Sequence, residues 1–301
     1  MKQSIYAIAL FLGLCLSPDI QAQPQHPSDG YPVANDAHLV LLSSQFSFTE
    51  GPTSDRKGTI YFTDQPNNKI WKYTTKGKLR LFMDDAGRSN GLYIDKRGWL
   101  VACADENNEL WRISPKGKVT KLIRNYQDTL FNGPNDVWVS AKGYIYFTDP
   151  YYQRDYWTRT KQDLSVQALY RLKDKQVVRL DADFNQPNGI VGSADEQFLY
   201  VADIGANKTY RYRITADGSL TDKTLFANQG SDGMTVDQDG NLYLSGNGIT
   251  VYNAKGEKIN HIPVPAKWTA NLCFGGKNHD MLFITASEKI FMLKMQVKGV
   301  D

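Results

Sequence analysis

The chain has 301 residues, of which 41% are hydrophobic and 12% aromatic, and its 35 Lys and Arg against 32 Asp and Glu give a net charge of +3. This hydrophobic content is ample for a packed core, and the length is compatible with two average domains or with one all-β propeller or barrel. The charged residues are spread along the chain without a long basic run, which argues against nucleic acid as a partner.

The first 22 residues have the pattern of a secretory signal peptide. Lys2 supplies a positive charge, an apolar run of 12 residues extends from Ile5 to Leu16, and Ile20-Gln21-Ala22 provides a cleavage site. No other stretch of the sequence is long and apolar enough to span a bilayer. We therefore expect an exported, periplasmic protein that makes no membrane contact after cleavage; the alternative is an uncleaved N-terminal anchor.

Residues 23–37 are rich in Pro, Gln, Asn and Asp and show no apolar periodicity, so we expect an exposed leader. A short apolar strand, 38–44, follows without a hairpin partner beside it in the sequence. After signal removal the cysteines are Cys103 and Cys273. They fall in different repeats of the pattern described next, so two buried thiols are expected rather than a disulfide.

One pattern of two strands and a turn occurs six times. Its clearest copy is FNGPNDVWVSAKGYIYFTDPYY, residues 131–152, in which Val137–Val139 is followed by a turn at Ser140–Gly143 and a returning strand at Tyr144–Thr148. A polar residue leads each copy, and the steps between these leading residues are 40, 45, 53, 44 and 39. A third strand follows each hairpin, and a more polar fourth strand usually follows that.

Four strands in each repeat of about 45 residues are typical of the blades of a β-propeller. Six repeats therefore predict an all-β, six-bladed propeller over residues 38–301. The sixth repeat lacks a fourth strand, so we expect the isolated strand 38–44 to fill that position and close the ring. Two packed sandwich domains are the alternative, but they would not explain one period through the whole mature chain.

The first strand of each blade lines the central channel of a propeller, so the leading residues should form a ring at one level. They are Glu50, Asn90, Asn135, Asn188, Asp232 and Asn271. All six carry oxygen, and a hard cation such as Ca²⁺ takes about six to eight oxygen ligands. The absence of His and Cys from the ring disfavours Zn²⁺ or Cu. Each residue alone could be an ordinary turn residue at a strand entrance, but six in register favour a metal site.

The Glu-Gly-Pro of the first repeat, NGPND and GYIYFTDP of the third, QPNG of the fourth and SDGM of the fifth resemble the SMP-30/gluconolactonase family. The resemblance spans essentially the whole mature chain and implies a six-bladed propeller that hydrolyses lactones with a central divalent cation. It implies a catalytic Ca²⁺, or another divalent cation such as Zn²⁺, Mn²⁺ or Mg²⁺. The ligands it implies are Glu50, Asn135, Asn188 and Asp232, with Asn90 and Asn271 nearby as substrate contacts.

The expected reaction is hydrolysis of a sugar lactone such as glucono-1,5-lactone to the aldonic acid. The cation would polarise the lactone carbonyl and stabilise the oxyanion. Asp232 is the candidate general base or nucleophile and Glu50 chiefly a ligand, although the reverse assignment stays open.

The long third step contains Tyr152 and Arg154, which suit a polyol ring or a carboxylate, and Arg88 is a further candidate contact. An ordinary surface loop with its aromatic residues packed down is the alternative. Some animal members of the family carry Arg where Gly133 stands, so the identity of the lactone stays open.

The sequence contains no GxSxG, HExxH, GxxxxGK[ST] or GxGxxG motif, and none of its four His residues belongs to the ring. Two alternatives to a sugar lactonase remain. One is another lactone or phosphotriester hydrolase on the same site, and the other is a non-enzymatic propeller that binds a ligand. The sequence does not fix the oligomeric state.

Overall fold

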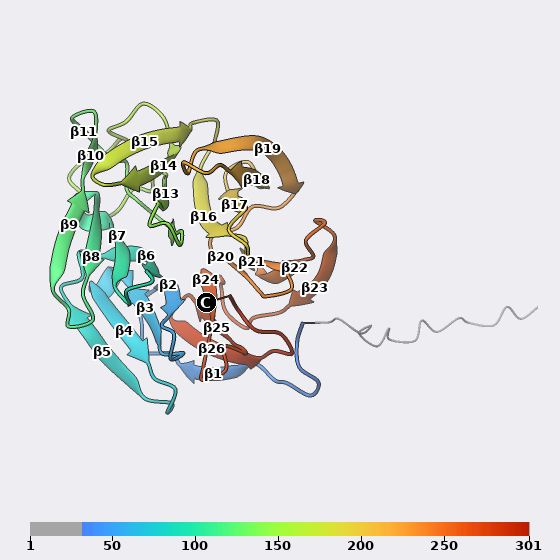
Figure 1. Ribbon diagram of the computed structural model, residues 1–301. Coiled ribbons are helices and arrows are strands. Elements are labelled where there is room, and N and C mark those ends of the chain that lie inside the picture. The colour runs from blue at the N-terminus through green and yellow to red at the C-terminus, as the bar shows by residue number, and fades with distance from the viewer. Residues whose placement is uncertain (1–31, 301) are drawn as a thin grey trace, which may run out of the picture. The chain divides into compact units, whose positions relative to one another are not determined.

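Six four-stranded antiparallel sheets surround a central channel as the blades of a propeller (Figure 1). The computed structural model of the chain describes residues 32–300. The predicted signal peptide, residues 1–22, lies outside this range. The all-β, six-bladed fold expected from the repeats is confirmed.

The strands of the blades follow one another in chain order. The first blade contains β2 (Thr49–Ser54), β3 (Ile60–Asp64), β4 (Lys69–Tyr73) and β5 (Leu79–Asp84), and the second contains β6 (Ser89–Ile94), β7 (Leu100–Ala104), β8 (Glu109–Ile113) and β9 (Val119–Ile123). The third contains β12 (Val137–Val139), β13 (Ile145–Asp149), β14 (Ala168–Lys173) and β15 (Gln176–Asp181), and the fourth contains β16 (Pro187–Gly192), β17 (Phe198–Asp203), β18 (Lys208–Ile214) and β19 (Leu220–Ala227). The fifth contains β20 (Met234–Val236), β21 (Leu242–Gly246), β22 (Gly248–Tyr252) and β23 (Lys258–Ile262), and the sixth contains β24 (Asn271–Gly275), β25 (Met281–Ala286) and β26 (Lys289–Lys294).

The fourth strand of the sixth blade comes from the other end of the described chain. β1 (Val40–Ser43) pairs antiparallel with β26, so that Val40 lies opposite Met292. The segment before it is less exposed than the sequence suggested. Pro32 is buried and Val33 pairs with Met295, because the apolar side chain of Val33 packs on the core of the sixth blade.

The core lies between the blades rather than at the centre of each sheet. All five residues of β13 are buried, since both of its faces pack against other strands, whereas the outer strand β15 alternates between exposed and half-buried positions. Cys103 and Cys273 are buried free thiols, as expected. A small hairpin, β10 (Asn125–Tyr126) and β11 (Thr129–Leu130), lies outside the blades. No helix in residues 32–300 is long and apolar enough to cross a membrane.

An aspartate at the end of the second strand fixes the entrance to several blades. Asp64 accepts hydrogen bonds from the backbone N–H groups of residues 47 and 48. Asp149 does the same for residues 132 and 133, and Asp203 for residues 185 and 186. In each case the two donors precede the leading residue of the same blade by three and two positions. The FTD and VAD sequences are therefore repeated because they hold the leading residue in place.

The second repeat departs from the sequence alignment by one residue. Thr49 pairs with Asp64 in the first blade, and the equivalent Ser89 pairs with Ala104 in the second. Asp105 is thus not equivalent to Asp64, as the sequence comparison assumed, but to Gln65. These two residues begin the single-turn 3-10 helices η1 (Gln65–Asn67) and η2 (Asp105–Asn107). The side chain of Asp105 is consequently free for a different use.

Candidate active site at one end of the channel

The leading residues of the blades meet at one end of the channel, at the start of the innermost strands. Asn188 Nδ2 donates a hydrogen bond to Asp232 Oδ1 at 2.8 Å, and Asn271 Nδ2 donates to Glu50 Oε2 at 3.2 Å. Both bonds join neighbouring blades. Glu50 and Asn188 are only 3% and 2% exposed. The sequence prediction that these residues converge around the axis is therefore correct for these two pairs.

Asn90 and Asn135 are held in the ring by their backbones. The carbonyl of Asn90 accepts from Thr63 Oγ1 at 3.0 Å, and the carbonyl of Asn135 accepts from the N–H of Gly91 at 2.8 Å. Both Asn side chains are buried.

Glycine follows most leading residues because the inner strands approach one another closely there. A Cβ on Gly51, whose φ is +47°, would lie 2.2 Å from the carbonyl oxygen of Asn90. A Cβ on Gly233 would lie 1.9 Å from Cγ of Asn271. A side chain at either position would push two blades apart. These glycines therefore allow the ring to be tight, beyond any role in a turn.

Three acidic side chains lie within electrostatic reach of one another in the channel. Burial raises the pKa of Glu50 well above its usual value, and the negative charges of Asp232 and Asp136 raise it further. Burial also raises the pKa of Asp232 to about 6 and that of Asp136 to about 7. Removing carboxylates from water and placing them together disfavours their charged forms. A cation placed among them would reverse this effect.

One buried oxygen in the ring has no hydrogen-bond donor. The amide nitrogen of Asn188 donates to Asp232 and to Tyr152 Oη, both at 2.8 Å, which leaves Oδ1 without a partner among residues 32–300. Glu50 Oε2 accepts from the N–H of Gly51 at 2.8 Å and from Asn271, whereas Oε1 accepts no hydrogen bond from residues 32–300. Buried acceptors of this kind usually have a partner. The two free oxygens are therefore candidate ligands of a cation.

The segment between β13 and β14, residues 150–167, lies at the mouth of this end of the channel, and we call it the strap. Tyr152 reaches the ring through Asn188, and the guanidinium of Arg154 lies 5.4 Å from the centre of the Tyr152 ring. Burial dominates and raises the pKa of Asp232, and the charge of Arg154 opposes this rise only in part. Arg88 lies 4.5 Å from the ring centre of Tyr156 and donates to a backbone carbonyl. Of the five predicted substrate contacts, Asn90 and Asn271 thus belong to the ring, Tyr152 is bonded to it, and Arg154 and Arg88 lie against Tyr152 and Tyr156 of the strap.

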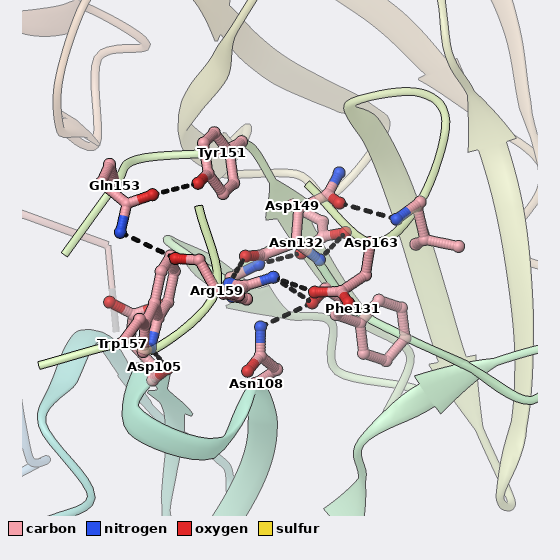
Figure 2. Close-up of polar contacts among 12 residues, drawn as sticks. Asp105, Asn108, Phe131, Asn132, Asp149, Tyr151, Gln153, Trp157, Arg159 and Asp163 are labelled. Atoms are coloured by element: carbon pink, nitrogen blue, oxygen red, sulfur yellow. Dashed lines mark hydrogen bonds and ion pairs between the residues drawn. The ribbon is translucent and has the colours of Figure 1, made fainter. Parts of the chain in front are cut away.

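The rest of the strap packs down on the second and third blades, as in the alternative reading of the sequence. Figure 2 shows the guanidinium of Arg159 reaching the carbonyl oxygens of Phe131 and Asn132 and the carboxylate of Asp163. The same guanidinium stacks on Trp157, with its central carbon 3.6 Å from the centre of the Trp157 ring. This part of the strap therefore has its aromatic residues packed down, while contact of Tyr152 and Arg154 with a substrate stays a prediction.

A second opening lies at the other end of the channel. A cavity of about 360 Å³ is lined there by the distal parts of the inner strands and reaches Asp136 and Asn271 from the opposite side. Its walls include Tyr93 and Trp138. The uncommitted oxygens of Glu50 and Asn188 do not line it, so the candidate site belongs to the end covered by the strap.

The sequence model of the SMP-30/gluconolactonase/LRE-like region matches residues 48–288. The chain belongs to this family. A gluconolactonase from Zymomonas mobilis subsp. mobilis is 28% identical to this family member over 293 residues, covering 87% of this chain and 82% of that protein. A solved gluconolactonase from Xanthomonas campestris is 28% identical with a TM-score of 0.81, over 88% of this chain and 91% of that one. The calcium-binding protein regucalcin from Agrobacterium tumefaciens has the same fold, with a TM-score of 0.75 and 21% identity over 87% of this chain and 95% of that one.

These similarities show that this SMP-30/gluconolactonase family member is a lactone hydrolase and that its substrate is a small-molecule lactone. The alternative of a non-enzymatic ligand-binding propeller is thereby wrong.

Sequence reasoning missed two residues at the candidate site of this lactone hydrolase. Trp268 Nε1 donates to Asp232 Oδ2 at 2.7 Å, although Trp268 lies in the connection before β24 and has no signal in the repeat. Asp136 was seen only as part of the PND motif. Its neighbour Asn135 was chosen because that residue is in register with the other leading residues, yet the carboxylate of Asp136 lies close enough to Glu50 to raise the pKa of Glu50, while it also lines the cavity at the opposite end.

Proposed function

We propose that the chain hydrolyses a sugar lactone such as glucono-1,5-lactone to the aldonic acid, using a divalent cation bound at the strap-covered end of the channel. Ca²⁺ is the first candidate. The observation that supports the proposal best is the buried Asn188 Oδ1, which lacks a donor among residues 32–300 in a side chain bonded to Asp232, whose carboxylate in turn interacts electrostatically with that of Glu50. An oxygen in this position suits a cation, and a hydrogen-bond donor could serve it only from outside the described residues.

The donors available here fit a hard cation. We propose Glu50, Asn135, Asn188 and Asp232 as its ligands, all of which offer carboxylate or amide oxygen. No group of three His, Cys, Asp and Glu side chains in residues 32–300 is arranged to hold a metal ion. A cation at this end would therefore depend on the amide oxygens. A divalent cation bound there supplies a Lewis acid for the lactone carbonyl oxygen.

Asp232 is the proposed general base. Its two carboxylate oxygens each accept one hydrogen bond, from Asn188 Nδ2 and from Trp268 Nε1, and these bonds fix the plane of the carboxylate. A carboxylate held in this way can take the proton from a water molecule that attacks the lactone carbonyl. The same geometry would serve Asp232 as a nucleophile, and replacing it by the isosteric amide removes either role.

Tyr152 is the proposed donor to the substrate. Its hydroxyl oxygen accepts a hydrogen bond from Asn188, and no acceptor among residues 32–300 takes its own proton. That O–H can therefore donate to a hydroxyl or to the ring oxygen of a lactone. Burial raises the pKa of Tyr152 above the range in which it would ionise near neutral pH, so the proton is present for binding.

The decisive experiment is hydrolysis of glucono-1,5-lactone by the purified mature protein, with and without a chelator. We expect acid release that is lost with chelator, restored by Ca²⁺, and reduced at least about a hundredfold in Asp232→Asn. Asp239→Asn is the matched control, because Asp239 is an exposed aspartate in a turn of the same blade. Activity that survives chelation, or an Asp232→Asn variant as active as the control, would contradict the proposal. Hydrolysis of phosphotriesters or other lactones alone would replace the proposed substrate.

We further propose that residues 1–22 direct export and that the mature protein works in the periplasm. The support is the charge, apolar run and cleavage site of this segment. Intact mass and N-terminal sequencing of the protein recovered from a periplasmic extract should place the mature N-terminus at Gln23. Recovery of the uncleaved chain with the membrane fraction would contradict this.

A further inference from the structure

The carboxylate of Asp105 gathers hydrogen bonds from the strap. Its Oδ2 accepts from Arg154 Nε at 2.9 Å, from the Tyr156 hydroxyl at 2.6 Å and from Gln65 Nε2 at 3.1 Å. Its backbone carbonyl accepts from Trp157 Nε1 at 3.2 Å. Asp105 is 2% exposed. Since all three side-chain partners donate to one oxygen, the bonding pattern is that of a charged carboxylate.

The packing around Asp105 leaves no space for a side chain at position 133. Gly133 has a φ of +154°, and a Cβ there would lie 2.7 Å from Asp105 Oδ1 and 2.9 Å from the ring of Trp157. The contact between blade and strap therefore depends on glycine at this position. It also depends on the position of Asp105, which is the first residue after β7 rather than the last residue of that strand.

Each arginine at the mouth of the channel has its own carboxylate partner. Arg154 is paired with Asp105, Arg159 with Asp163, and Arg88 lies 3.6 Å from Glu106. The guanidinium nearest the ring, Arg154, thus offers hydrogen-bond donors without bringing unbalanced positive charge. Beyond it, the carboxylates of Glu50 and Asp232 would offset the charge of the proposed divalent cation, so the ring offers an anionic substituent no excess positive charge.

We propose that Asp105 is a specificity-determining positioning residue: it orients Arg154 toward the substrate and cancels its charge, so that the site selects lactones with uncharged hydroxyl substituents over lactones that carry a carboxylate or phosphate. This rests on the proposed lactone hydrolysis at the same end of the channel. Asp105 itself does not touch the reacting atoms. It acts through Arg154, whose N–H groups would donate hydrogen bonds to the substituents of the lactone ring.

The test compares kcat/KM for glucono-1,5-lactone with that for its 6-phosphate and for the lactone of glucaric acid. In the wild type we expect the neutral lactone to be preferred. In Asp105→Asn the freed charge of Arg154 should raise the ratio of anionic to neutral kcat/KM by about tenfold, mainly through KM, and added salt should reduce the gain. In Arg154→Gln the ratio should fall by a similar factor, because Asp105 then stays unpaired.

Asp163→Asn is the matched control, since it also removes a carboxylate paired with an arginine of the strap, Arg159, but leaves Arg154 untouched, and its ratio should equal that of the wild type. Melting temperatures show whether each variant is folded. If Asp105→Asn does not fold, Arg154→Gln decides the question by the direction of its ratio. Calorimetric binding of the neutral and phosphorylated lactams, which are not hydrolysed, should show the same changes in affinity.

The outcomes separate the two proposals. A wild type that hydrolyses the neutral lactone while Asp105→Asn and Arg154→Gln leave the ratio unchanged would overturn the role of Asp105 alone. A wild type that prefers the anionic lactones would do the same. A wild type that hydrolyses none of the three lactones and binds neither lactam would overturn the proposed function, and this inference with it.

Discussion

Replacing Asp136 by asparagine should make the chelated protein more stable at alkaline pH. Asp136 is 6% exposed, and its carboxylate accepts hydrogen bonds from the backbone N–H groups of Val137 at 2.9 Å and Ile190 at 3.4 Å. No cationic side chain among residues 32–300 is paired with it. Asparagine has the same shape, can keep the bond from Val137 and carries no charge. The substitution therefore removes a buried charge at the cost of the long hydrogen bond from Ile190 and of the favourable interaction with the Asn271 side chain.

The magnitude follows from the pKa of Asp136, which burial raises from 3.8 to about 7. The folded state thus holds this proton more tightly than the unfolded chain, so the stability of the protein falls as pH rises through this interval. The shift of about three units costs on the order of 4 kcal/mol at pH 8, about 2 kcal/mol at pH 5 and less than about 1 kcal/mol at pH 4. Asp136→Asn should recover most of this cost at pH 8 and little at pH 4.

Urea unfolding with a chelator present, at pH 8, 5 and 4, measures the effect. Asp239→Asn, an exposed aspartate, is the control and should change the free energy of unfolding by less than about 0.5 kcal/mol at each pH. If Asp136→Asn destabilises the chelated protein at pH 8, or if its effect does not shrink as the pH falls, then Asp136 is not a buried unpaired charge and the reasoning is wrong.

Three further predictions concern the candidate site. Trp268→Phe removes the donor to Asp232 Oδ2, so kcat should fall about tenfold with little change in KM or melting temperature; a rise in KM alone would indicate a role in binding instead. Tyr152→Phe removes the hydroxyl that accepts from Asn188, so steady-state kinetics should show kcat/KM for a sugar lactone reduced about tenfold, and unchanged kinetics would exclude Tyr152 as a substrate donor. Gly133→Ala should lower the free energy of unfolding by about 2 kcal/mol in urea titrations, because alanine is strained at this φ and meets the Asp105 carboxylate; a neutral effect would show that the strap can shift.

The fold could be predicted from the sequence because the same pattern of strands and turns is repeated six times. The period, the turns and the polar residue before each inner strand are local features, so each blade could be found without knowledge of its neighbours. The register then placed Glu50, Asn188 and Asp232 at one level of the channel. The same locality explains the assignment of β1 to the sixth blade, since an isolated strand and an incomplete repeat stood at opposite ends of the chain.

What the sequence could not provide depends on contacts across blades. Trp268 reaches Asp232 from a connection that has no repeated pattern, and the partner of Asp105 lies in a segment that no other blade contains. The one-residue displacement of Asp105 was also not visible in the sequence. By residue type Asp105 aligns with Asp64, but strand pairing makes Ala104 the equivalent of Asp64. Such details are fixed by backbone hydrogen bonds, which residue identity does not reveal.

The pairing of β1 with β26 has a consequence for the order in which the ring can form. The two strands lie about 250 residues apart in the chain, so their pairing closes a very long loop and carries a corresponding entropic cost. During synthesis the first five blades are complete before β26 exists, and the first-made strand must wait unpaired for the last. Until then the backbone donors and acceptors of β1 can pair with other chains. The apolar face that the first blade turns to the sixth is uncovered for the same time. Pairing with β26 satisfies these backbone groups, so the exposure of β1 to other chains ends when the ring closes.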